Sequence, residues 1–121
     1  MGYIKPRKKK QMSASDHLSK QFKDYVIKFK PAPADDDMAN HKIIAQHKGR
    51  RVGKMEWDTG TGDIQNLEVH PRHQRKGIAT AMWEHAQEIS GNTVGHSPVR
   101  SDDGDAWAKS VGGDIPPRSK E

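Results

Sequence analysis

A short basic loop in the second half of the sequence has the composition of an anion-binding site. It runs from Pro71 to Lys76, between a β-prone segment, residues 63–70, and an amphipathic segment that begins at Gly77. The N–H groups in the first turn of a helix have no partner within the helix and carry the positive end of its dipole, so they favour a phosphate. Small side chains at Gly77 and Ala79 would let a phosphate come close to these groups. Three cationic side chains would favour a diphosphate, and they are Arg72, Arg75 and Lys76.

The spacing of residues in this loop is more specific than its charge. Neither Gly-x-Gly-x-x-Gly nor Gly-x-x-x-x-Gly-Lys-Ser/Thr occurs, which excludes two common phosphate-binding motifs. The order is instead a strand, the spacing Gln74-x-x-Gly77-x-Ala79 and a helix. This order resembles the acetyl-CoA-binding signature, Gln/Arg-x-x-Gly-x-Gly/Ala, of the GNAT superfamily of N-acetyltransferases. The alternative is an ordinary strand–loop–helix connection with a solvated basic loop, and the flanking elements favour the resemblance.

The resemblance covers roughly residues 22–115 and implies both a fold and a cosubstrate, acetyl-CoA. The fold would be a mixed α/β domain of the α+β class. It would have a central, mostly antiparallel twisted sheet and a CoA-binding helix after the fourth strand, in a minimal version of the family. In that family the strand before the loop pairs with the pantetheine arm, and N–H groups of the loop and first helical turn hold the pyrophosphate. The resemblance gives the first role to Leu67, Glu68 and Val69, and the second to Gln74, Arg75, Lys76, Gly77, Ile78, Ala79 and Thr80.

The implied reaction, acyl transfer to an amine, needs a base. A lysine-type amine has a pKa of about 10.4, so making it neutral at pH 7 costs roughly 4–5 kcal/mol. Glu68 and His70 lie two residues apart on one face of the predicted strand. His70 has the better ordinary pKa for a base, whereas Glu68 would need its pKa raised by burial. The family often places a carboxylate on this strand, which favours Glu68, with Asp63 as a third candidate. Each could equally be a solvated strand residue.

The oxyanion that forms when the amine attacks the thioester could be stabilised by a strand N–H near Val69.

The family's general acid is missing from the matching stretch, residues 103–113. Trp107 matches the aromatic residue of the family pattern and Gly112 the glycine, but Ala108 stands where a Tyr often protonates the departing thiolate. Gly113 replaces the usual Phe. A thiolate can leave without strong acid help, so the departure from the pattern does not exclude activity.

Alternating and β-branched residues predict the strands that must position this loop. A hairpin is expected around the turn at residues 48–50, followed by a second turn at residues 58–62. Alternation in the strand before the loop places Ile64 on the face of Asn66, Glu68 and His70. The predicted strands are residues 24–30, 41–47, 51–57, 63–70 and, more briefly, 93–97.

Helical periodicity predicts a helix from about Gly77 to Ser90, stopped by Gly91-Asn92. Its expected buried stripe includes His85, which is interpreted as a satisfied core or boundary histidine, and the other members are Ile78, Ala81, Met82, Ala86 and Ile89. A second helix is predicted over residues 104–110, with Asp102 or Asp103 as its cap and Gly112-Gly113 after its end. Residues 35–37, all aspartates, indicate a loop or the cap of a short helix at 36–40.

Composition predicts one domain with a basic tail. The net charge is +5, and the first ten residues supply five basic side chains and no acid, so the rest of the chain is balanced. We expect residues 1–20 to form a mostly unstructured tail, 21–117 the domain and 118–121 a C-terminal tail. The chain has no cysteine, which excludes a disulfide framework and a thiolate nucleophile. No apolar run is long enough for a membrane span, and a cytoplasmic location is expected.

Metal chemistry is not expected, although the sequence is rich in histidine. His70 and His73 are three residues apart in a loop that contains Pro71, which is not the spacing of a helical ligand pair, and no carboxylate-rich partner set accompanies them.

The leading functional hypothesis is an N-acetyltransferase that carries an acetyl group from acetyl-CoA to a small amine, a protein lysine or an N-terminus by direct attack in a ternary complex. A second is a catalytically weak binding module whose tail contacts an acidic partner or nucleic acid. Binding of nucleic acid by the tail together with the loop is disfavoured, because no aromatic residues are interleaved with the charges.

Overall fold

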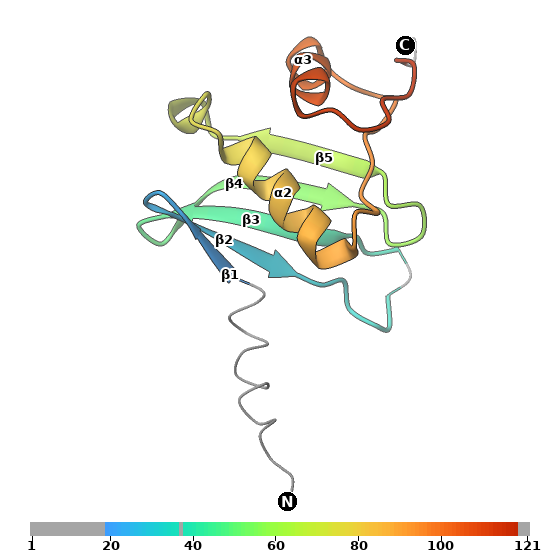
Figure 1. Ribbon diagram of the computed structural model, residues 1–121. Helices are drawn as coiled ribbons and strands as arrows, with labels where there is room; N and C mark the ends of the chain where they lie inside the picture. Colours follow the sequence, from blue (N-terminus) through green and yellow to red (C-terminus); the bar gives the residue numbers. More distant parts are fainter. Residues whose placement is uncertain (1–18, 37, 119–121) are drawn as a thin grey trace, which may run out of the picture.

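The computed structural model describes residues 19–36 and 38–118, and it is an α+β domain. Five strands form one sheet in sequence order, each antiparallel to the next, with one long helix on one face (Figure 1). The predicted class and the antiparallel sheet are therefore confirmed. The strands are β1 Ser19–Phe22, β2 Tyr25–Lys30, β3 His41–His47, β4 Arg50–Trp57 and β5 Ile64–Val69.

Strand β1 was not predicted from the sequence. Ser19 and Lys20, which were assigned to the tail, form the first half of β1, and Phe22 pairs with Tyr25 across a two-residue turn. The helix after residues 64–69 consequently follows the fifth strand rather than the fourth. The remaining predicted tail residues, 1–18 and 119–121, lie outside the described residues.

The hairpin between β3 and β4 is tighter than predicted. His47 pairs with Arg50, so the turn is Lys48-Gly49 alone, with φ values of 52° and 81°. Two consecutive left-handed residues define the type I′ turn, which matches the twist of a two-stranded hairpin. Gly49 takes this conformation without a Cβ penalty, whereas Lys48 takes it at some cost.

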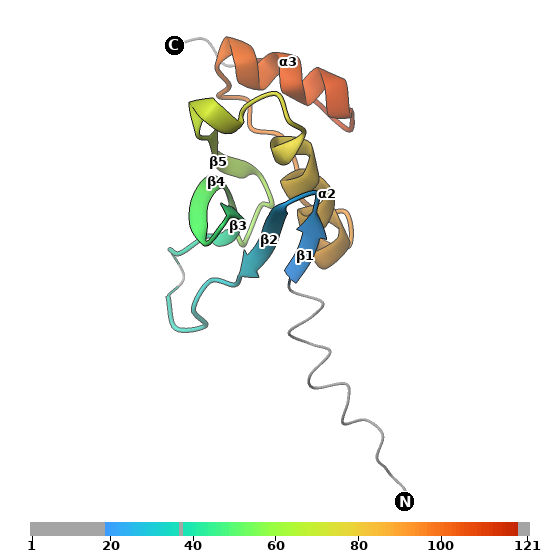
Figure 2. The ribbon, with the colours of Figure 1, turned by 90° about the vertical axis from the view of Figure 1, so that its left-hand side faces the viewer.

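The helix α2, Ile78–Ser90, packs its apolar stripe against one face of the sheet and makes the core. The predicted helix and its stop at Gly91 are confirmed, and every predicted buried residue is buried except Ile89, which is half-buried at the edge of the core. A Cβ on Gly53 of β4 would lie 3.2 Å from Met82 Cε, so the glycine lets the helix approach the strand. Figure 2 shows α2 on one side of the sheet and no helix on the other side, within the described part of the chain. The largest fully buried side chains are Ile27, Ile43, Met55, Ile78 and Met82.

His85 in α2 is buried, as predicted, but it is not satisfied. Among the residues described, neither ring nitrogen has a hydrogen-bond partner, and the nearest acid, Glu88, places Oε1 3.5 Å from His85 Nδ1. Periodicity predicts that a side chain is buried but says nothing about its polar partners, which come from other elements.

A bulge in the ladder between β4 and β5 changes which residues share a face. Glu56 pairs with Asn66 but Trp57 pairs with Ile64, so Gln65 has no partner across the ladder. Ile64 is therefore buried in the core, and the prediction that it shares a face with Asn66 is wrong.

Three further predictions are corrected around the ends of elements. Residues 93–97 form no strand, because only Gly95 bridges to the sheet, through a parallel pair with Asp63. The second helix, α3, spans Asp102–Val111 and is capped by Ser101, whose Oγ accepts a hydrogen bond from Gly104 N at 3.0 Å. Asp102 lies inside the first turn, as does the other predicted cap, Asp103.

The connection between β2 and β3 contains turns and no helix at residues 34–36 and 38, so the predicted loop is confirmed and the alternative of a short helix is wrong for the described residues. Met38 N donates to Asp36 Oδ1 at 3.0 Å, a local contact that favours a turn over a helix. Asp37 lies outside the described residues. No helix within residues 19–36 and 38–118 is long and apolar enough to cross a membrane.

Candidate functional site

The start of α2 presents unpaired backbone donors. Gly77 is the residue before the first helical turn, with φ 86°, and it provides no side-chain cap. The first backbone bond at this end runs from Ala81 N to Gly77 O, at 2.9 Å. In the described part of the chain, no group accepts a hydrogen bond from the N–H groups of residues 75–80. A cluster of unpaired N–H groups at the positive end of a helix is the arrangement that binds phosphate.

The outer edge of β5 lies next to these donors and is open. His70 N donates to Val52 O at 2.7 Å, which makes alternate residues of β5, Glu68 included, face β4 with their backbone groups. The backbone groups of Leu67 and Val69 therefore point away from the sheet. Among the described residues this edge is paired at both ends: Ile64 N donates to Gly95 O at 2.9 Å, and Val69 O accepts a hydrogen bond from the side chain of Gln74. The backbone groups of Leu67 and the N–H of Val69 have no partner among these residues.

Gln74 connects the open strand to the loop. Its Nε2 donates to Val69 O at 2.8 Å, so the side chain folds back over the end of β5. His70 also shapes the loop, because its Nδ1 accepts a hydrogen bond from Arg72 N at 3.2 Å at the start of the short 3₁₀ helix Pro71–His73. These contacts give Gln74 and His70 structural roles in placing the loop.

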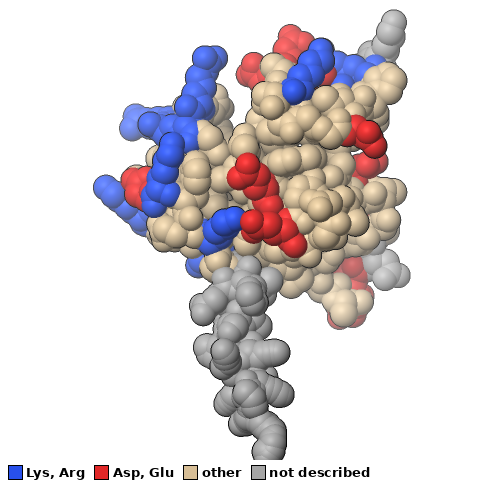
Figure 3. Space-filling view, viewed as in Figure 1, with Lys and Arg blue, Asp and Glu red and all other residues tan. Residues whose placement is uncertain are grey.

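A basic cavity of about 570 Å³ lies on the other side of the loop. Figure 3 shows Lys and Arg side chains gathered at this end of the molecule, where the loop and the first two hairpin turns lie. The cavity is lined by Lys23, Asp24, Tyr25, His47, Arg72, His73, Arg75 and Lys76. We refer to it below as the basic pocket.

Hydrogen bonds organise the inner wall of the basic pocket. Tyr25 Oη and His73 Nδ1 share a hydrogen bond of 2.9 Å, and His47 Nε2 lies 3.0 Å from Asp24 Oδ2. Burial, followed by the positive charge of neighbours such as His47 and His70, lowers the pKa of His73 below its ordinary value. Contact with His47 lowers the pKa of Asp24. His73 is thereby kept neutral near pH 7, as a hydrogen-bond partner for a buried tyrosine.

The predicted catalytic side chains occupy three different settings in the structure. Glu68 is exposed on the sheet face opposite α2, where its Oε2 accepts from Asn66 Nδ2 at 3.1 Å and lies 3.6 Å from Lys54 Nζ. His70 is at the end of the strand and is engaged with the loop backbone. The third candidate, Asp63, is half-buried at the start of β5, beside Gly95.

An aromatic cluster of Trp83, His96 and Trp107 joins α3 to α2, and the sequence pattern does not predict it. The ring of His96 stacks on Trp83 with a centroid separation of 4.4 Å, and His96 Nε2 lies 2.8 Å from Gly112 O. Trp107 Nε1 donates to Thr80 Oγ1 at 3.2 Å, which fixes α3 against the first turn of α2. Ala108, at the position of the missing Tyr, is fully buried, so this position contributes no polar group.

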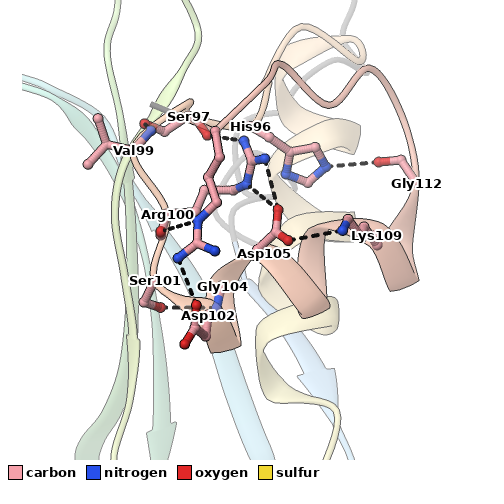
Figure 4. Close-up of polar contacts among 11 residues, drawn as sticks. His96, Ser97, Val99, Arg100, Ser101, Asp102, Gly104, Asp105, Lys109 and Gly112 are labelled. Carbon is pink, nitrogen blue, oxygen red and sulfur yellow. Dashed lines mark hydrogen bonds and ion pairs between the residues drawn. The ribbon is translucent and has the colours of Figure 1, made fainter. Parts of the chain in front are cut away.

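An ion-pair network holds the segment before α3 (Figure 4). The guanidinium of Arg100 is 2.8 Å from Asp105 Oδ1 and also donates to Ser97 O at 2.6 Å. Asp105 contacts Lys109 in addition, and these two cations lower the pKa of its carboxyl group. The network therefore ties the segment that leaves the sheet after Gly95 to the first turn of α3.

A second cavity, of about 420 Å³, lies near the opposite end of α2 and lacks the features of a phosphate site. Its wall includes the stacked rings of Phe29 and Trp57 and the turn that follows β4. Among the described residues that line it, Asp58 is the only acid, and it accepts hydrogen bonds from Gly60 N and Thr61 N within its own turn. In residues 19–36 and 38–118, no group of three or more His, Asp or Glu is placed to hold a metal ion.

Comparisons with known proteins agree with the observed fold. A model of the acetyltransferase (GNAT) family matches residues 10–103, whereas no curated protein matches the sequence. A solved GNAT-family acetyltransferase from Streptococcus pneumoniae TIGR4 aligns with a TM-score of 0.56 at 18% identity, over 75% of this chain and 88% of that one. An acetyltransferase from Trypanosoma brucei aligns with a TM-score of 0.51 at 18% identity, over 69% of this chain and 68% of that one. At this level of identity, the two structures show a shared fold.

Proposed function

The chain belongs to the GNAT family of acetyltransferases, as its loop pattern predicted, and on this premise we propose that it transfers an acetyl group from acetyl-CoA to a primary amine. The amine would attack the thioester carbonyl in a ternary complex, and the CoA thiolate would leave. The acceptor would be a small molecule, a protein lysine or an N-terminus. Holding amine and thioester in reacting geometry can contribute about 7–11 kcal/mol toward the barrier.

One observation carries this proposal: the unpaired N–H groups of residues 75–80 lie beside the edge of β5, where Leu67 and the N–H of Val69 have no backbone partner among the described residues. The pyrophosphate would take the N–H groups of the loop and first turn from Arg75 to Thr80, because Gln74 N already donates to Pro71 O at 3.4 Å. The pantetheine amides would pair with Leu67 and Val69, whose backbone groups point outward. Of the three strand residues predicted for this role, Glu68 directs its backbone toward β4, so the pairing would fall to Leu67 and Val69 alone.

The base remains a proposal, with Glu68 as the first candidate and His70 as the second. The carboxylate of Glu68 is exposed and forms an ion pair with Lys54, whose Nζ lies 3.6 Å from Glu68 Oε2. His70 would have to give up its hydrogen bond from Arg72 N before Nδ1 could accept a proton, which favours Glu68. With Ala108 buried in the place of the usual Tyr, the thiolate would leave without a protein acid at this position.

Two measurements test the proposal in sequence. A thermal-shift assay should show a rise in Tm with acetyl-CoA, because a ligand at a hundred times its Kd stabilises the folded state by about 2.7 kcal/mol. Release of free CoA thiol with a panel of amines should then show turnover. An unchanged Tm over a millimolar range of acetyl-CoA would contradict the proposal.

Substitution at the two base candidates assigns the proton acceptor. We expect Glu68→Gln to lower kcat about a hundredfold with the acetyl-CoA Kd unchanged, which is the usual size of a general-base contribution. His70→Gln serves as the comparison, and its effect should be on cofactor affinity through the loop. The reverse pattern would assign the base to His70.

One alternative has its own support: a binding module of the same fold with little or no catalysis. The burial of Ala108 favours it, since α3 presents no hydroxyl at the position of the usual Tyr. Such a module could use the basic tail to contact an acidic partner or nucleic acid. A Tm shift with acetyl-CoA, without thiol release for any amine, would select this alternative.

A further inference from the structure

We propose that the turn between β1 and β2 is part of the acyl-CoA site, and that the basic pocket it forms with the loop binds the 3′-phosphate of CoA. This inference rests on the proposed function and adds a specificity-determining residue, Lys23. CoA contains a pyrophosphate and, on its ribose, a separate 3′-phosphate. The inference is that this chain has one site for each.

The β1–β2 turn is in direct contact with the phosphate-binding loop. A Cβ on Gly77 would lie 3.2 Å from Phe22 Cζ, so the ring of Phe22 lies against the residue that starts α2. Lys23 Nζ donates to Lys76 O at 3.4 Å, across 53 residues of sequence. Lys23 has a φ of 55°, a conformation that non-glycine residues seldom adopt. The strained turn therefore places an ammonium group at the loop.

The basic pocket has the charge to receive a phosphate. Four cations line it, against a single acid, Asp24, which is engaged with His47. Within the described residues none of these cations is paired with a carboxylate, and they are Lys23, Arg72, Arg75 and Lys76. A phosphate monoester carries about −1.5 to −2 charges at pH 7 and accepts several hydrogen bonds. The pocket volume, about 570 Å³, leaves room for such a group and its water.

The position of the basic pocket indicates that it binds a second phosphate of the same CoA molecule rather than an unrelated anion. The pocket lies beside β2 and β3, through Tyr25 and His47, whereas the pantetheine edge belongs to β5 at the other side of the sheet. The loop and the start of α2 lie between the two. A pyrophosphate on the loop would thus have the pantetheine arm on one side and the adenosine with its 3′-phosphate on the other.

A pair of matched variants tests this inference. Lys23 and Lys48 each take the first position of a two-residue turn, with φ values of 55° and 52°, and only Lys23 lines the basic pocket. Asparagine tolerates this backbone conformation, so Lys23→Asn and Lys48→Asn both remove a charge and keep the turn. Calorimetry would give the Kd of each variant and the wild type for acetyl-CoA and for its dephospho form, which lacks the 3′-phosphate.

The expected result is that the wild type prefers acetyl-CoA over the dephospho form by about tenfold or more, as one charge-assisted contact can provide. Lys23→Asn should bring this ratio toward one by weakening acetyl-CoA alone, while Lys48→Asn keeps the wild-type ratio. Binding of acetyl-CoA with a wild-type ratio near one, or a ratio unchanged in Lys23→Asn, would overturn the inference and leave the proposed function intact. If acetyl-CoA does not bind the wild type, the proposed function fails and this inference fails with it.

Discussion

The two helices of this domain begin in opposite ways. The first residues of α3 are satisfied from within the chain, because Ser101 caps the helix and three acids, Asp102, Asp103 and Asp105, occupy its first turn. The first turn of α2 has no side-chain cap and no acid, and it follows Gly77 and a loop with three cations. Both helices have the same unpaired donors and the same dipole by construction. Only one of them uses its own side chains to satisfy these groups.

This difference assigns two tasks to the two helix starts: the start of α3 contributes to stability, and the start of α2 is left available for binding. The start of α3 holds structure, since it fixes the segment that leaves the sheet and anchors the helix through Arg100 and Asp105. The start of α2 keeps its donors available, and the stabilisation that a cap would supply, about 1 kcal/mol, is absent. Changes at α3 should therefore alter stability with little effect on binding, and changes at α2 should do the reverse.

The largest effect on stability is expected at the ion pair of α3. The side chain of Arg100 is 7% exposed, and Arg100→Leu would leave the carboxylate of Asp105 with Lys109 as its only cation. Removing one member of a buried pair is strongly destabilising, so Tm should fall by roughly ten degrees. The double variant Arg100→Leu with Asp105→Leu should recover much of this loss. A single variant that melts like the wild type would show that the network is not a stabilising element.

The next largest effect is expected from a carboxylate in the first turn of α2. Ala79→Asp gives α2 the acidic first turn that α3 already has, so the helix should be stabilised by about 0.3–1 kcal/mol through the dipole. The same charge would repel the pyrophosphate, and the Kd for acetyl-CoA should rise about a hundredfold. Ala79→Asn is the neutral control and should lose much less affinity. If Ala79→Asp binds acetyl-CoA like the wild type, the start of α2 is not the anion site.

A smaller effect is expected from removing the cap of α3. Ser101→Ala removes the acceptor of the Gly104 N–H and should cost about 1 kcal/mol in the free energy of unfolding, measured with urea. Ser101→Asp is the matched control, because aspartate caps as well as serine does. The Kd for acetyl-CoA should stay unchanged in both variants, and a change in binding would contradict the separation between the two helix starts.

The sequence predicts those parts of the fold that local chemistry determines. Helix α2 has a 3.6-residue apolar period, and glycines lie at both of its ends, so its limits and buried face follow from the sequence alone. The position of the turn between β3 and β4 follows from the tolerance of Gly49 for positive φ, although its length of two residues does not. The loop pattern predicted the family because it is a local pattern too.

The features that the sequence does not predict depend on contacts between residues that are distant in the chain. Strand β1 has three exposed residues out of four and is held by pairing with β2, so no alternation marks it. Lys23 reaches the loop only because this hairpin forms, which is why the basic pocket could not be anticipated. The bulge at Gln65 depends on the register with β4, and the single bridge at Gly95 depends on how the chain leaves the sheet.

The smallest effect is expected from a change in pH. It should again distinguish the loop before α2 from the start of α3. Burial and nearby positive charge lower the pKa of His73 in the folded state, while in the unfolded chain it titrates near 6.5. Below that pH the unfolded state binds the extra proton, so this contribution to stability is full above about pH 6.5 and declines as the pH falls through the folded pKa. The pKa of Asp105 is lowered as well, so the α3 contribution is retained until the pH falls below about 4. Hydrogen exchange between pH 7 and 5 should therefore show faster opening at Tyr25 and the loop, with α3 protection kept after correction for intrinsic rates. In His73→Gln the pH dependence in this window should flatten, and an equal slope in the variant would mean that another group titrates there.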